Sequence, residues 1–507
     1  MDFFKFDSEV WTKLVELLQY DSMSPMTLAS GFFLFSFLIF GLGYMAVRNH
    51  RTMRTLYVVI VSAYFYYKIS GLYLLLLLAV AVSDYLIGGR ISRRLSRGKR
   101  ARGWVALRMA INIAILSYFQ VGGLFEEAIN SLFGNGTINL GAIVVPAGVS
   151  FFVFQSISYV IDISRGVISP VKRFIDYLFL LSFFPKVFLG PLVRNKEFIP
   201  QIERESIVVT REDQGRAVVL IASGLIKYAV IAKAIDSILL IPAVSGEFGE
   251  SGVVMLMALY GFGIRLYCDF SGYSDIAIGI ALVMGYKLPD NFDAPFKSAT
   301  ITEFWRRWHI SLSTWLRDYL YISLGGNRKG RVRTYLNLTI TMFVCAMWHK
   351  VNILYVIWGL MQGVGLALHK LWLERVPGAK IKGEDMKWGW RLLSTFMLFH
   401  FMTLLWPMIC CDDWAGASVI YERIIYNFSA GDIVGLAHKA GFGIVLVLIG
   451  YSIHFLPKSL NAKAVSFVTR SGFVGQLVIM VFAIWMVMQC QLMLAADGGG
   501  LPVYAAF

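Results

Sequence analysis

The sequence predicts an all-α polytopic membrane protein. Of its 507 residues, 57% are hydrophobic and only 16% are charged, and the mean hydropathy is +0.64. Soluble domains are about one quarter charged, whereas apolar runs of roughly 20 residues, long enough to span a bilayer as a helix, recur along this chain. The alternating strands of about ten residues that build a transmembrane barrel are not seen. We therefore expect helices, which satisfy their own backbone hydrogen bonds inside the membrane.

The net charge of +15 would suggest nucleic-acid binding in a soluble chain. In a membrane protein, Lys and Arg instead gather in cytoplasmic loops, and we expect membrane lipids rather than nucleic acid as the partner. The cysteines lack metal-ligand spacing and lie mostly in apolar runs, so we interpret them as buried small side chains, with no disulfide and no metal site. They are Cys268, Cys345, Cys410, Cys411 and Cys490.

Residues 1–22 are expected to lie along the membrane surface. Asp2 to Tyr20 form an amphipathic pattern that Pro25 ends, which is typical of an interfacial helix. The first predicted span, Thr27 to Val47, follows a net acidic segment and precedes three arginines. By the positive-inside rule, the N-terminus is extracytoplasmic.

Further apolar stretches bring the predicted number of crossings to about twelve. Basic and acidic loops alternate between them consistently, which places the C-terminus outside as well. We interpret the densest basic loop, residues 90–102, as a determinant of topology rather than a site for anionic lipid or a phosphate-bearing donor. The stretches are Leu56 to Tyr67, Leu72 to Ile87, Trp104 to Leu124, Ala142 to Ile163, Ala217 to Leu240, Gly252 to Leu266, Tyr335 to Trp348, Asn352 to Leu368, Leu392 to Cys410, Gly441 to His454 and Gly472 to Gln489.

One apolar run, Phe183 to Leu192, is interrupted by two prolines and a glycine and has basic loops on both sides. Broken helices are tolerated at membrane depth only when they are buried in protein or line a cavity. Two interpretations stay open: a re-entrant segment that returns to the same side, or an ordinary span with a kink.

Titratable residues concentrate in residues 261–363. Thr300-x-x-Glu303 is a capping-box pattern and predicts that a helix begins there. Large apolar residues then recur at steps of three and four, which places them on one face of the helix. Trp and Tyr on such a face are typical of an interfacial helix at the level of the lipid headgroups. The residues of this face are Trp305, Trp308, Leu312, Trp315 and Tyr319.

Two of the seven histidines stand out. His309 lies between the apolar and polar sides of that predicted helix, where either a structural or a catalytic histidine would fit. His349 follows the basic cluster ending at Arg333 by about fifteen helical residues, which places it roughly 20 Å into the bilayer. An ionisable residue at that depth is a functional-site hypothesis; a histidine that caps the end of a span is the alternative. Neutral imidazole is well suited to take a proton from a hydroxyl group.

Other polar residues of the stretch are interpreted as structural. Arg265, Asp269 and Asp275 are expected to pair across helices and hold them around a cavity. His400 and His454 are isolated in apolar runs and are also expected to be structural. No Gly-x-Ser-x-Gly elbow or phosphate-binding loop is found, so covalent serine catalysis is unsupported.

The sequence resembles the membrane-bound O-acyltransferases, in particular the bacterial alginate O-acetylation subfamily. The resemblance is densest over residues 150–370, and Phe304-Trp-Arg-Arg-Trp-His-Ile-Ser-Leu-Ser and Leu324-Gly-Gly-Asn-Arg-Lys-Gly are highly specific. The resembling segments are Phe152 to Gly166, Phe183 to Leu192, Leu266 to Ile280, Pro289 to Arg333 and Trp348-His349.

The resemblance implies one membrane-embedded domain over residues 1–507, with a shell of helices around a tunnel. It implies that His309 and His349 are the essential pair and that His349 is the catalytic base. The family usually has Gly after Trp-His, whereas this chain has Lys350, and a cation beside the base would lower its pKa. Residues expected to line the path of the substrates are Trp348, Lys350, Arg306, Arg307, Ser313, Arg317 and Asp318.

The expected function is transfer of an acetyl group from a cytoplasmic thioester, acetyl-CoA or an acyl carrier, to an exported polysaccharide. The resemblance implies an extracytoplasmic partner protein, a location in the bacterial inner membrane and no tightly bound cofactor. Alginate, cellulose, peptidoglycan and capsule all remain candidate acceptors. Transfer of D-alanine to teichoic acid is an alternative within the family. A proton-coupled transporter or flippase is another, although the two related halves common in transporters are not seen.

Overall fold

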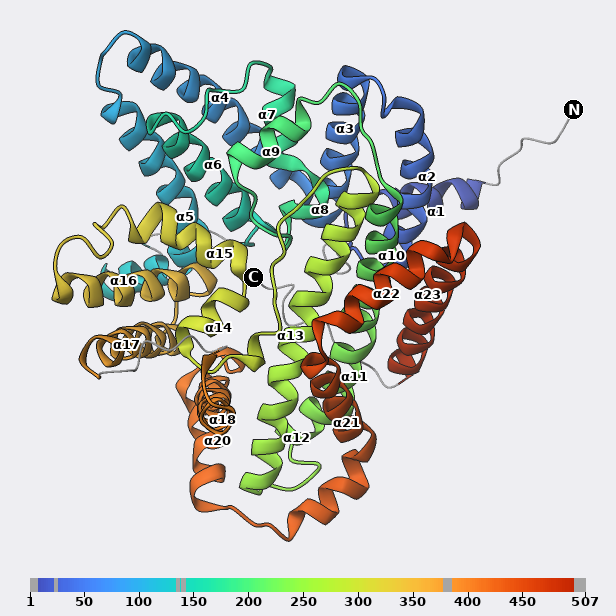
Figure 1. Ribbon diagram of the computed structural model, residues 1–507, viewed down its shortest axis with the longest axis vertical. Coiled ribbons are helices and arrows are strands. Elements are labelled where there is room, and N and C mark those ends of the chain that lie inside the picture. Colours follow the sequence, from blue (N-terminus) through green and yellow to red (C-terminus); the bar gives the residue numbers. More distant parts are fainter. Residues whose placement is uncertain (1–7, 22–25, 134–136, 138–142, 377–384, 497–507) are drawn as a thin grey trace, which may run out of the picture. The chain divides into compact units, whose positions relative to one another are not determined.

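The fold is all-helical in the computed structural model of the chain (Figure 1), with no strand among the residues that the structure describes. By its internal contacts the chain divides into two compact units. The N-terminal unit comprises Met1–Phe188 and Arg194–Val208, and the C-terminal unit comprises Leu189–Val193 and Val209–Phe507. The described residues are 8–21, 26–133, 137, 143–376 and 385–496.

Eight helices in the described part of the chain are long and apolar enough to cross a membrane, which makes this a multi-pass membrane protein. Two further apolar helices, Gly31–Val47 and Val149–Ser164, are shorter. The eight candidate spans are Arg51–Ser96, Arg102–Phe133, Arg211–Val244, Gly252–Val283, Ile353–Arg375, Trp388–Cys410, Asp432–Phe455 and Gly472–Met493.

The N-terminal unit contains the first nine α-helices. Its first helix coincides with the predicted amphipathic segment, and the predicted run 183–192 begins with one short helical turn whose residues are all buried. The helices are α1 Ser8–Leu18, α2 Gly31–Val47, α3 Arg51–Ser70, α4 Leu74–Ser96, α5 Arg102–Phe133, α6 Val149–Ser164, α7 Phe174–Ser182, α8 Phe184–Val187 and α9 Asn195–Ile202.

A fully buried polar network joins four helices of this unit. Asp84 of α4 accepts hydrogen bonds from Arg108 of α5 at 2.5 Å, from Ser156 of α6 at 2.8 Å and from Tyr177 of α7 at 2.6 Å. Since a buried charge is tolerated only when it is paired and hydrogen-bonded, this network fixes the four helices against one another.

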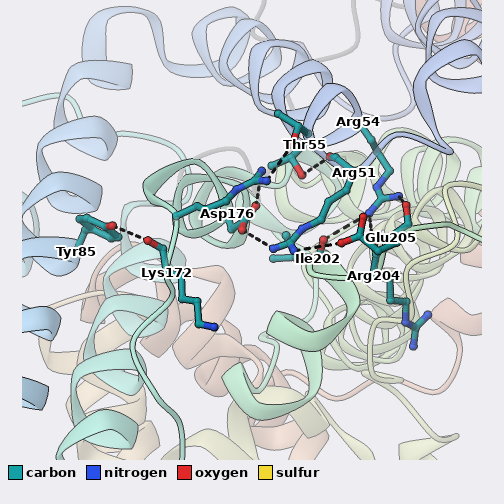
Figure 2. A network of polar contacts seen from close by, with 11 residues as sticks. Arg51, Arg54, Thr55, Tyr85, Lys172, Asp176, Ile202, Arg204 and Glu205 are labelled. Carbon is teal, nitrogen blue, oxygen red and sulfur yellow. Dashed lines mark hydrogen bonds and ion pairs between the residues drawn. The ribbon is translucent and has the colours of Figure 1, made fainter.

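A second network clamps the start of α3. Arg54, which is fully buried, donates to the carbonyl oxygens of Arg48 at 2.8 Å, of Glu205 at 3.2 Å and of Arg204. Arg51 beside it pairs with Asp176 at 2.9 Å, and Figure 2 shows both guanidinium groups turned toward these oxygens. The clamp ties the segment after α9 to α3.

The C-terminal unit contains the remaining helices and, in π-helical form, residues 226–231, 236–240 and 316–321. They are α10 Arg211–Leu225, α11 Ala232–Ile235, α12 Ile241–Val244, α13 Gly252–Val283, α14 Ile301–Arg307, α15 Ile310–Trp315, α16 Arg331–His349, α17 Ile353–Arg375, α18 Trp388–Leu405, α19 Pro407–Cys410, α20 Trp414–Tyr426, α21 Asp432–Phe455, α22 Lys458–Arg470 and α23 Gly472–Ala496.

Glycines bring the site-bearing helices close together. On α17, Gly359 and Gly363 are four residues apart and face α16: a Cβ on Gly359 would lie 2.5 Å from the Cβ of Ala346, and one on Gly363 would lie 2.6 Å from the Cα of Thr339. This small-xxx-small pattern allows close approach of two membrane helices. It sets the position of His349, the last residue of α16, relative to α17.

The cysteines follow the sequence prediction in part. Cys268, Cys345 and Cys490 are buried, and no cysteine is in a disulfide. Cys410 is exposed, because α19 ends there.

Candidate active site

The predicted helix that begins at Thr300 and carries one face from Trp305 to Tyr319 is wrong as a continuous element, because the chain breaks at His309. The capping box does start a helix, since Thr300 accepts from the N–H of Glu303 at 3.1 Å. That helix, α14, ends at Arg307, and His309 adopts a left-handed backbone with φ 42° before α15 begins (Figure 1). A left-handed residue other than glycine costs about 1–2 kcal/mol, and such strain concentrates at functional sites.

The break also changes the role of the aromatic residues. Trp308, Leu312 and Trp315 are buried, so these three belong to the core and not to an interfacial face. Trp308 stacks on Phe304 with the ring centroids 5.6 Å apart. The helical periodicity of the sequence therefore marked buried positions correctly, but the face it predicted does not exist as one continuous surface.

His309 and His349 line the same pocket, together with a wall of large apolar side chains. The pocket is built by α13, α14, α15, α16, α17, α18 and α19 of the C-terminal unit. Among the described residues that line it, there is no Ser, Cys, Asp, Glu, Lys or Arg. The lining residues are Leu266, Phe270, Phe304, Trp305, Trp308, His309, Leu312, His349, Tyr355, Trp358, Met402, Trp406 and Ile409.

His309 is held from one side only. Its side chain is 1% exposed, and its Nδ1 lies 3.0 Å from the Oδ1 of Asn291. Its Nε2 is buried with no hydrogen-bond partner. The ring of Phe270 stands edge-on to the imidazole, with centroids 4.7 Å apart. Burial, and secondarily the nearby His349, lowers the pKa of His309 well below its usual value, so the imidazole is neutral at physiological pH.

His349 stands at the end of α16 among aromatic rings. Its ring centroid lies 4.5 Å from that of Trp348, 6.4 Å from that of Tyr355 and 6.3 Å from that of Trp358. Neither pocket histidine belongs to one of the eight candidate spans.

The family comes from comparison with known proteins. The model of the membrane-bound O-acyltransferase family matches residues 164–411, which contain both pocket histidines. A probable alginate O-acetylase of Pseudomonas aeruginosa is 38% identical over 434 residues, covering 84% of this chain and 80% of that protein. The chain belongs to the membrane-bound O-acyltransferase family. This confirms the resemblance that the sequence motifs indicated.

Two relatives with other acceptors also match this acyltransferase. A peptidoglycan O-acetyltransferase of Helicobacter pylori is 30% identical over 428 residues and covers 78% of each chain. A teichoic acid D-alanyltransferase of Streptococcus thermophilus is 33% identical over 244 residues, covering 45% of this chain and 57% of that protein. The protein is thus a membrane-embedded enzyme of O-acyl transfer.

Other residues predicted to line the substrate path lie outside the pocket wall of the acyltransferase. Lys350 pairs with Asp412 at 2.7 Å, so its charge has a partner other than His349. Arg307 pairs with Glu303 at 2.9 Å, and Arg317 pairs with its neighbour Asp318 at 2.7 Å. The members of the predicted set that the described pocket does not include are Trp348, Lys350, Arg306, Arg307, Ser313, Arg317 and Asp318.

The buried charges of α13 pair as ions of opposite sign. Arg265 contacts Asp236 at 2.7 Å and Asp269 at 3.3 Å, and Lys227 contacts Asp275 at 2.5 Å. These pairs tie α13 to the α10–α12 region. Among the described residues, no group of His, Cys, Asp and Glu could hold a metal ion.

Sequence reasoning missed several residues of the site. Asn291 precedes α14 by ten positions, and its partner His309 is eighteen positions away. Gln362 of α17, fully buried, accepts from the indole N–H of Trp305 at 3.0 Å and so fixes one wall of the pocket. Met402 and Trp406 come from α18 and its end. The only signal was that Asn291 lies inside a family-like segment; the others are inconspicuous in apolar runs.

Proposed function

We propose that this acyltransferase transfers an acetyl group from a cytoplasmic thioester to hydroxyl groups of an exported polysaccharide. The observation that carries the proposal is the pocket: two imidazoles stand in a wall that contains no serine, cysteine or carboxylate. The described lining therefore offers no serine, cysteine or carboxylate for an acyl-enzyme; its nucleophilic side chains are the two imidazoles and the phenol of Tyr355. Direct attack by the acceptor hydroxyl needs only a positioned base, and imidazole is suited to that role.

In the proposed reaction, the hydroxyl oxygen attacks the carbonyl carbon of the thioester. The new C–O bond forms as the C–S bond breaks; His349 takes the hydroxyl proton and returns it to the leaving thiolate. The wall of aromatic rings keeps water out, which limits hydrolysis of the thioester.

The pocket favours an acetyl group over a D-alanyl group. A D-alanyl group carries an ammonium ion, and a buried ammonium needs a carboxylate or several acceptors beside it. The lining includes no Asp or Glu, whereas an acetyl methyl group fits a wall of aromatic and aliphatic side chains. The alginate and peptidoglycan relatives, which are O-acetylating proteins by name, cover more of the chain than the D-alanyl relative does. The family assignment disfavours the transporter interpretation.

For the topology we infer twelve crossings, an enclosed tunnel and both termini outside the bacterial inner membrane. The eight candidate spans become twelve when Arg51–Ser96 counts as the two helices α3 and α4 and when α2, α6 and α16 also cross. The basic residues at the ends of these helices support the orientation. Acetyl-CoA or an acyl carrier thioester would enter from the cytoplasm, with no tightly bound cofactor.

An extracytoplasmic partner completes the proposal. Such a protein would accept the acetyl group at the outer face and place it on the polysaccharide. Candidates are an acetyltransferase or an acceptor protein of a polysaccharide modification system.

The test is acetyl transfer by the purified protein in vesicles supplied with radiolabelled acetyl-CoA, or labelled acetyl carrier, and polysaccharide. With the extracytoplasmic proteins of the system included, we expect label on the polysaccharide with the wild type, and loss of transfer in His349→Ala. His438→Ala is the matched control, because His438 is an exposed histidine of the same unit.

Two results would overturn the proposal. One is normal transfer by His349→Ala, which would remove the assigned base. The other is turnover of a D-alanyl thioester in preference to an acetyl thioester, which would favour the alternative. Transfer that appears only after the extracytoplasmic proteins of the system are added would support the partner-mediated route.

A further inference from the structure

We propose that Asn291 is a positioning residue: it holds His309 in the tautomer that carries its proton on Nδ1, so that Nε2 faces the pocket as a hydrogen-bond acceptor for the substrate. This inference rests on the proposed function and concerns the same pocket. It follows from the identity of the atoms around the Asn291 amide.

The backbone of Asn291 supports the break at His309. The N–H of Ile310, which follows the left-handed His309, donates to the carbonyl oxygen of Asn291 at 2.9 Å. The N–H of Ser311 donates to the side-chain Oδ1 of the same residue at 3.3 Å. The start of α15 is therefore held on Asn291 by two hydrogen bonds, which offset the strain of the left-handed residue.

The orientation of the Asn291 amide follows from its partners. A backbone N–H can only donate, so the atom that faces the N–H of Ser311 must be the oxygen. The hydroxyl of Ser311 also donates to this oxygen, at 2.8 Å. The amide nitrogen donates in the opposite direction, to the Oγ of Ser274 on α13 at 3.0 Å. Every contact is consistent with one orientation of the amide.

The same oxygen fixes the proton on His309. Nδ1 lies 3.0 Å from Oδ1 of Asn291, and two acceptors cannot share a hydrogen bond, so Nδ1 must carry the proton. In a neutral imidazole the other nitrogen then has the lone pair. That nitrogen, Nε2, is buried, has no partner among the residues that the structure describes and belongs to a pocket-lining residue. An open acceptor of this kind is costly unless a ligand fills it.

Both substrates carry hydrogen-bond donors that can pair with Nε2 of His309. The acceptor hydroxyl carries an O–H, and the pantetheine arm of a coenzyme A or carrier thioester carries amide N–H groups. A hydrogen bond from either would satisfy Nε2. The other tautomer, with the proton on Nε2, would present a donor to the pocket and could accept neither.

The test compares Asn291→Leu, Asn291→Asp and Ser274→Ala in the vesicle assay. Leucine removes the acceptor that selects the tautomer, so kcat should fall on the order of 100-fold. Ser274→Ala is the matched control; it removes a bond to Asn291 but leaves Oδ1 in contact with His309, and kcat should stay near the wild-type value. In Asn291→Leu, the substrate whose KM rises, polysaccharide or thioester, is the one that Nε2 binds.

The Asn291→Asp variant should shift the pH profile of kcat, which a purely structural role of Asn291 would not predict. Its carboxylate also accepts from Nδ1–H, so it should restore activity, but it favours the imidazolium and raises the pKa of His309. The neutral form would then be lost at a higher pH, and the acid limb of the kcat profile should move upward by about one unit or more. His349 of α16 is the titratable group that faces His309 from the surrounding elements; Phe270 and Asn291 carry no charge.

Nitrogen-15 NMR of histidine-labelled protein tests the tautomer without activity, using His309→Gln to assign the signal. Wild type should show protonated Nδ1, and Asn291→Leu a mixture. Protonated Nε2 in the wild type, or wild-type kcat in Asn291→Leu, would overturn the proposal. If the wild type transfers no acetyl group at all, the proposed function fails instead, and the NMR result still decides the role of Asn291.

Discussion

His400 and His309 lie in the same unit, yet their surroundings differ in one decisive way. His400 of α18 donates from Nδ1 to the carbonyl oxygen of Phe396 at 2.8 Å and accepts at Nε2 from the hydroxyl of Tyr260 at 2.9 Å. Both of its nitrogens are therefore occupied by the protein. His309 has one nitrogen occupied by Asn291 and the other open toward the pocket.

This difference distinguishes a structural histidine from one that can bind a substrate. A histidine with both nitrogens satisfied can hold helices together but has no lone pair to offer a substrate. The carboxylate of Asp84 in the N-terminal unit is satisfied in the same sense, since it accepts from α5, α6 and α7. The open acceptor of His309 lies instead in a largely apolar pocket wall, within the residues that the family model matches.

The largest expected effect comes from replacing each of the two histidines, in separate variants, with glutamine. His309→Gln should lower acetyl transfer on the order of 100-fold, because it removes the acceptor that we propose positions the substrate. His400→Gln should leave kcat near the wild-type value, because glutamine can keep one of its two structural hydrogen bonds. Initial rates of label transfer measure both. Equal losses in the two variants would break the distinction between open and closed sites.

The next largest effect is expected on stability, from breaking the buried Asp84–Arg108 pair. Arg108→Leu leaves Asp84 buried without its cation, and breaking a buried pair costs roughly 3–5 kcal/mol of stability. We expect a clear fall in the thermal unfolding temperature in detergent, with normal kcat per folded molecule. Arg93→Leu, an exposed arginine at the end of α4, is the control. Loss of kcat at unchanged stability would assign this network to the chemistry.

A smaller effect is expected from Lys350→Gly, which restores the residue usual in the family. The Lys350–Asp412 pair is solvent-exposed, at 43% and 94% for the two side chains, and such pairs contribute about 0–1 kcal/mol. Activity should change little, and any change should diminish as salt screens the pair. A large shift in the pH profile would instead mean that Lys350 acts on His349.

Much of this molecule could be predicted from local sequence. Hydropathy located the spanning helices because each must be apolar over its whole length, and the capping box located the start of α14. The two histidines stood out because titratable residues are scarce in apolar surroundings. These features depend on neighbours in the chain.

The break at His309 could not be predicted this way. It depends on hydrogen bonds from Ile310 and Ser311 to Asn291, about twenty residues upstream, and helical periodicity continues across it. The far wall of the pocket also depends on distant chain segments, since Met402 and Trp406 lie about a hundred residues beyond His309. Such contacts have no local signal in one sequence.

The close packing of α16 on α17 has a consequence for protein engineering. Gly359 and Gly363 set how closely the two helices approach, while Tyr355 and Trp358 of the same helix line the cavity. The residues that fix the helix pair and the residues that shape the cavity are thus different residues of one helix. A smaller side chain at Trp358 would enlarge the cavity and leave both glycines in place, which makes α17 the place to begin when redesigning this enzyme for longer acyl groups.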